Sequence, residues 1–151
     1  MAGRKFTVKS GAVNIGASVT KTILAVTAPS THGIILTSME VSFELATSTD
    51  RGYTVEYVTW TTDGTGTAVT AIDNADRQDD GSPALTAKKN YTVEPTVGEI
   101  VIRSGYVGGD KGNDSFPGGL RIKASETFGV RIIAPGTPAG NNVRVTFGGD
   151  E

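Results

Sequence analysis

Three glutamates on two predicted strands are the side chains best suited to acid–base chemistry. Glu40 and Glu44 share the polar face of one strand, and Glu56 lies on the polar face of the next. Some β-sandwich glycosidases place two such carboxylates on one sheet face. Four residues of extended chain separate Glu40 from Glu44 by about 13 Å, too far for a catalytic pair, so only Glu56 could approach either of them across strands. We prefer the simpler interpretation, a solvated strand face on which these acids pair with Lys or Arg.

The single histidine, His32, is a candidate base or metal ligand. The chain has no cysteine and no second histidine to join it, and nucleophilic or zinc sites need such partners. His32 precedes a glycine at the start of a strand, so we interpret it as a turn residue. The sequence also lacks a G-x-S-x-G elbow, a phosphate-binding glycine loop and a Cys-x-x-Cys pair. We therefore expect a protein that is not an enzyme and uses no cofactor.

An aspartate-rich segment resembles the start of a calcium loop. Asp76, Gln78 and Asp80 place oxygen ligands two residues apart before Gly81. The position where a bidentate glutamate should close such a loop is Ala87, and no helix is predicted on either side, so the segment fails as an EF-hand. The candidates for a looser cation site are Asp73, Asp76, Asp79 and Asp80, with a second cluster at Asp110, Asn113 and Asp114. Solvated loops more often explain such clusters, and we predict no metal site.

Three large aromatic side chains, Tyr57, Trp60 and Tyr106, could form a platform on which a sugar stacks. Aromatic residues of a β-sandwich are more often core or interface anchors, because each of them buries a large apolar area. We prefer the second interpretation and keep sugar binding as an alternative.

The elements that must hold these residues are predicted to be strands. The chain has 21 Thr, 15 Val and 10 Ile but only 5 Leu, and β-branched side chains favour extended backbone. The segment from residue 39 to 45 alternates strictly, with Met39, Val41, Phe43 and Leu45 apolar and the residues between them polar. This alternation is typical of a strand with one buried face, and it fixes the register of the strand.

Short strands separated by turn residues are expected along the whole chain. The expected strands are 6–9, 19–27, 33–37 continuing into 39–45, 53–61, 67–72, 91–94, 99–107, 119–123, 128–134 and 143–147. Polar stretches at 74–89 and 105–118 predict two long loops. Eight or more such strands predict an all-β antiparallel sandwich or barrel. We expect a single domain over residues 17–151 with long loops at one end, preceded by an N-terminal arm or edge strand over residues 1–16.

Charge and composition exclude several classes of protein. With 14 basic and 16 acidic residues the formal net charge is -2, and no basic stripe is present of the kind that binds nucleic acid. No apolar stretch approaches the length of a membrane span, and the first residues lack the apolar run of a signal peptide. We expect no nucleic-acid or membrane partner and synthesis in a cytoplasm. Without disulfides, oligomerisation is an expected source of robustness.

Four stretches carry a resemblance to a known family. They are APSTHGIILTSMEVSF at 28–43, VEPTVGEIVIRSGY at 93–106, FPGGLRIK at 116–123 and FGVRIIAP at 128–135. In this order the strand-and-turn pattern, which spans about residues 19–147, resembles small jelly-roll proteins encoded among the head genes of tailed bacteriophages. The resemblance implies an antiparallel jelly-roll β-sandwich that serves as a capsid decoration (cement) protein or a related virion component, and such proteins are often trimeric. It offers no catalytic residues.

The resemblance implies a location and partners for this chain. The location is the capsid surface of a virion, and the partners are the major capsid protein of the same virus and other copies of the chain, as a homotrimer. We expect the arm, residues 1–16, to lie against a neighbouring subunit or the capsid instead of closing its own core. The candidate capsid or subunit contacts are Arg4, Lys5, Phe6, Lys9, Tyr106, Lys111 and Phe116. The alternative function is a glycan-binding β-sandwich, either associated with a phage tail or fibre or free.

Overall fold

The computed structural model describes residues 4–16, 19–44, 52–73, 83–106, 111–134 and 141–151. Within these ranges, the side chains of residues 72–73, 102–106, 111–115, 117 and 141 lie outside the description. The described secondary structure consists of strands, without a helix. Accordingly, no helix that could cross a membrane is found among the described residues.

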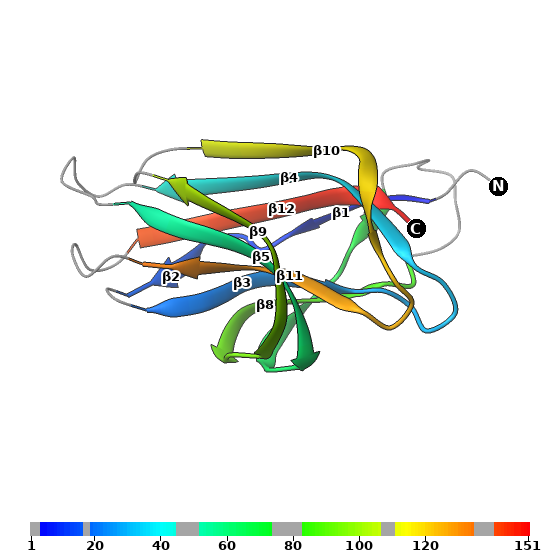
Figure 1. The fold of residues 1–151 in the computed structure, drawn as a ribbon, viewed down its shortest axis with the longest axis horizontal. Coiled ribbons are helices and arrows are strands. Elements are labelled where there is room, and N and C mark those ends of the chain that lie inside the picture. Colours follow the sequence, from blue (N-terminus) through cyan, green and yellow to red (C-terminus); the bar gives the residue numbers. More distant parts are fainter. Residues whose placement is uncertain (1–3, 17–18, 45–51, 74–82, 107–110, 135–140) are drawn as a thin grey trace.

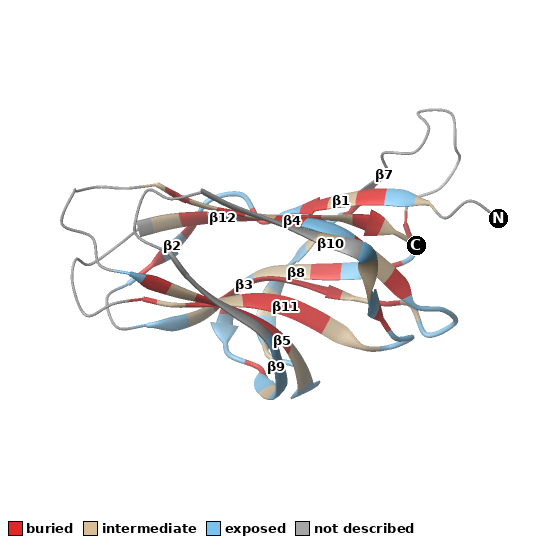
Figure 2. Cartoon of the chain, turned by 45° about the horizontal axis from the view of Figure 1, so that its top comes forward, coloured by how far each residue is buried: buried red, intermediate tan, exposed pale blue. Residues whose placement is uncertain are grey.

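The strands form two antiparallel sheets that pack face to face (Figures 1 and 2). Sheet A has the order β10 (Lys111–Ile122), β4 (Ile34–Glu44), β12 (Asn141–Asp150), β1 (Lys5–Lys9), β7 (Ile72–Asp73), and β2 (Val13–Ile15) also pairs with β12. Sheet B has the order β6 (Thr65–Val69), β8 (Thr86–Val93), β3 (Thr20–Thr27), β11 (Thr127–Ile133), β5 (Tyr53–Thr62), β9 (Thr96–Tyr106). The prediction of an all-β antiparallel sandwich is confirmed.

The core lies between the two sheets and follows the predicted alternation. In β4, Met39, Val41 and Phe43 are buried on one face, while Leu45 lies outside the described residues. Phe128 of sheet B packs near the centre, with ring centroids 6.3 Å from Tyr57 and 5.9 Å from Phe147 of sheet A. Figure 2 shows buried residues along the strands of both layers. These contacts across the two layers hold the sheets together.

The N-terminal segment does not behave as an arm. Residues 5–9 and 13–15 form β1 and β2, and β1 pairs with both β12 and β7. Phe6, Val8, Val13 and Ile15 are at most 3% exposed and belong to the core. The expectation that this segment lies against another subunit instead of closing its own core is therefore wrong. Its short apolar alternation is enough to form strands because β12 supplies the ladder partner.

The two predicted long loops are partly strand. The segment expected as a loop at 105–118 contains the end of β9 and most of β10, which pairs with β4 from Lys111 to Ser115 and again from Leu120 to Ile122. Between these blocks the register shifts, and Gly118 and Gly119 take positive φ angles of 79° and 78°. The loop expected at 74–89 ends where β8 begins at Thr86, and residues 74–82 lie outside the described residues.

Candidate interaction surfaces

The three candidate glutamates do not form an active-site pair. Glu40 and Glu44 lie on β4 of sheet A, whereas Glu56 lies on β5 of sheet B. Glu44 pairs with Arg144 of β12 and also accepts a hydrogen bond from the Asn142 amide at 3.3 Å. The prediction of cross-strand pairing with a cation is confirmed for Glu44. The sandwich thus separates Glu56 from the other two acids and excludes the paired-carboxylate hypothesis.

Glu56, unlike the expectation for all three glutamates, does not lie on a solvated strand face. Its side chain is 0% exposed and forms an ion pair with Arg131, its direct cross-strand neighbour on β11. Pairing with a cation is as expected, but the prediction that Glu56 is solvated is wrong. Residues Val55 to Val58 are all buried, and the ladder to β9 shifts register between Tyr57 and Val58. β5 lies between β11 and β9 and is buried on both faces over these residues, so the alternation of buried and exposed side chains does not hold there.

The outer face of sheet B is covered by the indole of Trp60. A Cβ atom added at Gly129 would lie 2.4 Å from Cη2 of Trp60, so the glycine makes room for the ring. Ala25 and Val58, the cross-strand neighbours of Gly129, are buried there too. Tyr91 packs against Trp60 with ring centroids 5.9 Å apart. This cluster is a second, small apolar core outside the main one.

The proposed sugar platform is not assembled by the described aromatics. Tyr57 is 0% exposed in the main core, which confirms its interpretation as a core residue. Trp60 covers Gly129 on the other face of the sheet, and its buried Nε1 has no hydrogen-bond partner among the residues that the structure describes. The side chain of Tyr106 lies outside the described residues. Tyr57 and Trp60 therefore cannot stack on one ligand.

Two polar clusters hold the turns beside the paired strands β6 and β8, and neither was expected from the sequence. The hydroxyl of Tyr91 donates to Asp63 at 3.3 Å, and Lys88 pairs with the same carboxylate. The pKa of Tyr91 is raised well above its usual range, mainly because the side chain is buried and also because the negative charge of Asp63 lies beside it. The Glu94 carboxylate accepts the backbone N–H of Thr22 at 2.8 Å and its hydroxyl at 2.5 Å. This bond lies where the β3–β11 ladder shifts register.

His32 lies in the turn before β4, as expected, with its side chain 46% exposed. Its Nε2 is 3.4 Å from Oε1 of Glu151, whose side chain is only 7% exposed. The Glu151 carboxylate also accepts the backbone N–H groups of Ala84 and Leu85, at 2.9 and 3.0 Å. Glu151 therefore ties the end of the chain to the segment before β8, a role that no sequence pattern indicates.

The aspartate clusters stay untested as cation sites. Asp76, Asp79, Asp80 and Asp110 lie outside the described residues, and only the backbones of Asp73, Asn113 and Asp114 are described. Among the residues whose side chains are described, no group of three or more His, Asp or Glu side chains could hold a metal ion.

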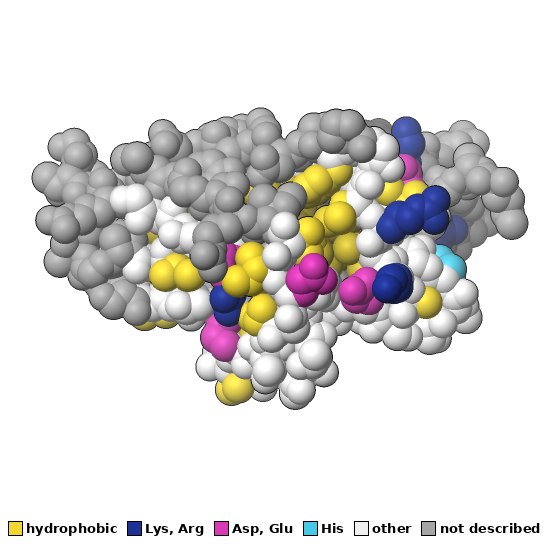
Figure 3. Space-filling view, viewed as in Figure 1, with side chains coloured by type: hydrophobic (Ala, Val, Ile, Leu, Met, Phe, Trp, Pro, Cys, Tyr) yellow, Lys and Arg dark blue, Asp and Glu magenta, His cyan; other side chains and the backbone are white. Residues whose placement is uncertain are grey.

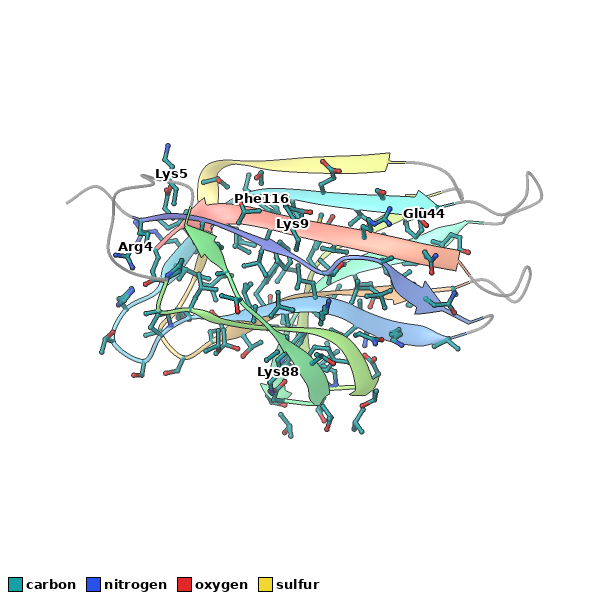
Figure 4. All side chains as sticks on the ribbon, turned by 180° about the vertical axis from the view of Figure 1, so that it is seen from behind. Arg4, Lys5, Lys9, Glu44, Lys88 and Phe116 are labelled. Atoms are coloured by element: carbon teal, nitrogen blue, oxygen red, sulfur yellow. The ribbon has the colours of Figure 1, made fainter. Side chains whose placement is uncertain are left out.

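The candidate contact residues differ in exposure, and Figure 4 labels four of them, Arg4, Lys5, Lys9 and Phe116. Lys5 and Lys9 are exposed on β1 of sheet A, and Arg4 beside them is half-buried. Phe6 is 1% exposed in the core, so the prediction that it contacts a partner is wrong. Phe116 is partly buried against the core and meets Tyr57 edge to face at 6.4 Å. The side chains of Tyr106 and Lys111 lie outside the described residues.

The outer face of sheet A is polar and has a shallow hollow. Along β4 and β12 the residues between the core positions are polar or glycine, apart from Ile35. The hollow, of about 440 Å³, is lined by Lys5, Phe6, Thr7, Thr37, Ser38, Gly148, Gly149 and Asp150. A Cβ atom at Gly149 would lie 2.2 Å from the Ile35 carbonyl oxygen, so a glycine is needed for the close strand contact here. Lys5 stands at the margin of this hollow.

Fold and surfaces together define a two-sheet antiparallel β-sandwich in which the outer face of sheet A is mainly polar. Comparisons with protein-family models, curated proteins and solved structures gave no match to this chain.

Proposed function

We propose that this chain is a non-enzymatic virion structural protein that decorates and stabilises the head shell of a tailed phage. The observation that carries the proposal is the strand order. The partial orders β10-β4-β12-β1 and β3-β11-β5-β9 place the first strand beside the last, and all but one of the connections between these eight strands pass from one sheet to the other. This order supports a jelly roll, which builds two sheets from eight strands, and it agrees with the fold implied by the sequence resemblance.

The outer face of sheet A is the surface that we assign to the shell. Long paired strands give a stiff, polar face, and Lys5 and Lys9 project from it. A rigid surface loses little conformational entropy when it docks. Several copies on one oligomer would multiply a weak contact through effective concentration. The partner on this proposal is the major capsid protein. The homotrimer is implied by the sequence resemblance alone, and the surface described below favours a dimer instead.

Reversing the charge of Lys5 and Lys9 tests this assignment. The Lys5→Glu/Lys9→Glu protein should bind shells stripped of the decoration protein at least about tenfold more weakly, a loss of roughly 1.4 kcal/mol. The measurement is co-sedimentation with stripped shells. Lys21→Glu, a charge reversal on β3 of sheet B, is the control and should bind like the unchanged chain.

Equal binding by both variants would overturn the assignment of this face. No binding of the unchanged chain to any stripped shell, together with a specific signal on a glycan array, would replace the decoration proposal with the glycan-binding alternative.

A further inference from the structure

The two sheets leave a groove at the side of the sandwich where β9 and β10 are the edge strands. In the described part of the chain, β9 pairs only with β5 and β10 only with β4. The groove has a volume of about 220 Å³. Its lining comprises Thr59, Glu99, Val101, Leu120, Arg121, Ile122, Lys123, Glu126 and Phe128. It is thus built from strands of both sheets, and we call it the edge groove.

The floor of the edge groove is apolar and partly open to solvent. Val101, one of the lining residues, is 38% exposed. Leu120 is partly buried and packs on the main core, while Phe128 below it is fully buried. Figure 3 shows a band of apolar side chains on this side of the molecule, bordered by acidic and basic ones. An exposed apolar patch with a polar rim is typical of a protein interaction site.

The rim of the edge groove carries two acids and two bases. Within the described residues, Glu99, Arg121 and Lys123 have no ion-pair partner, in contrast to Arg131 and Arg144, which are paired with carboxylates. The Glu126 carboxylate accepts the backbone N–H of Lys123 at 2.9 Å. The rim therefore carries equal numbers of both signs, and three of its charged groups have no ion-pair partner among the described side chains.

We propose that the edge groove is the self-association surface of the protein and that a second copy of the chain occupies it. An isologous contact brings the same patch of two subunits together, so a patch with equal numbers of both signs can complement itself. A two-fold rotation places the acids of one copy against the bases of the other, with Val101 and Leu120 of both copies between them. A partner surface of a single sign would meet repulsion from half of the rim.

The contact is made through side chains and not by joining the sheets. The β9 ladder has an extra residue at Val101, because Tyr57 pairs with Ile102 and Val58 with Ile100. The β10 ladder is interrupted between Ser115 and Leu120. Such bulges break the row of backbone donors and acceptors that an added strand would need. A groove of this size gives a small interface, so we expect a dimer with a dissociation constant on the order of micromolar.

A pair of valines provides the first test. Val101 and Val19 are both 38% exposed, but only Val101 lines the edge groove. Light scattering and sedimentation from about 1 to 100 µM should find a dimer for the unchanged chain and for Val19→Glu, and at least about tenfold weaker association for Val101→Glu. Thermal unfolding of both variants checks that the fold is kept.

Charge reversal provides the second test, which does not depend on the Val101 variant folding. Glu99→Lys makes the rim mainly basic and Lys123→Glu makes it mainly acidic, so each protein alone should associate more weakly than the unchanged chain. Mixed together, the two should form a heterodimer, because each rim then meets the opposite sign. Added salt should weaken the heterodimer.

A monomer at 100 µM, a trimer, or a dimer that Val101→Glu and the charge reversals leave unchanged would overturn the proposal. The inference goes beyond the decoration function and does not need it, since self-association is measured without a shell. A dimer that binds no stripped shell would defeat the decoration proposal and leave this one standing.

Discussion

The buried ion pair between Glu56 and Arg131 allows the effect of an unbalanced buried charge on stability to be measured. Glu56 is completely buried, and its cross-strand partner Arg131 retains 21% side-chain exposure. Removing one member of a buried ion pair typically costs about 3–5 kcal/mol, whereas replacing both members with apolar residues is often neutral. We predict that Arg131→Met lowers the free energy of unfolding by about 3 kcal/mol and that Glu56→Leu/Arg131→Met restores most of it. Denaturant unfolding of the two proteins measures both values, and equal stability of the single and double variants would contradict the assignment.

A substitution of Phe43 measures how much the main core contributes to stability. It is 6% exposed on β4 and its ring centroid lies 4.7 Å from that of Tyr53. Truncating a large core side chain removes apolar burial and leaves a cavity, so Phe43→Ala should destabilise the protein by about 3–5 kcal/mol. Val93→Ala, at a position 58% exposed, is the control and should change stability by less than about 0.5 kcal/mol. A denaturant midpoint unchanged by Phe43→Ala would show that this face does not form the core.

A strand could be predicted from the sequence where one of its faces is exposed to water and the other face packs in the core, because its side chains then alternate between polar and apolar. Met39, Val41 and Phe43 of β4 alternate in the sequence because sheet A has one solvated face. Only the first half of β10 was missed, whereas its second half was predicted as the strand at 119–123. The first half, Lys111–Ser115, is polar and contains a glycine, and its place in the sheet is set by the ladder to β4, which side-chain type does not reveal. Glu56 was misjudged for a related reason, since a register shift and burial on both faces of β5 remove the alternation.

The surface sites depend on residues far apart in the sequence, which explains why they were not predicted. The edge groove joins β9 residues 99 and 101 to the β10–β11 turn, and Glu151 reaches the backbone of Ala84 and Leu85. Neither pairing leaves a local pattern, because both follow from the order of strands within the sheets. The acidic and aromatic candidates, by contrast, were chosen by proximity in the sequence, and the sandwich separates Glu40 from Glu56 and Tyr57 from Trp60.

At the scale of the whole molecule, the first and last strands, β1 and β12, lie side by side in sheet A. β1 pairs with β12, and Arg4 and Glu151 exchange two backbone hydrogen bonds at 2.9 and 2.7 Å. β1 also contributes Phe6 and Val8 to the core. We predict that a chain lacking residues 1–10 loses its cooperative thermal transition, because the deletion exposes the edge of β12 and opens the core. Circular dichroism melting of this deletion and of a control that starts at Arg4 provides the measurement, and the control should melt like the full chain. A deletion that stays folded and loses only its assembly would instead restore the view of this segment as an arm.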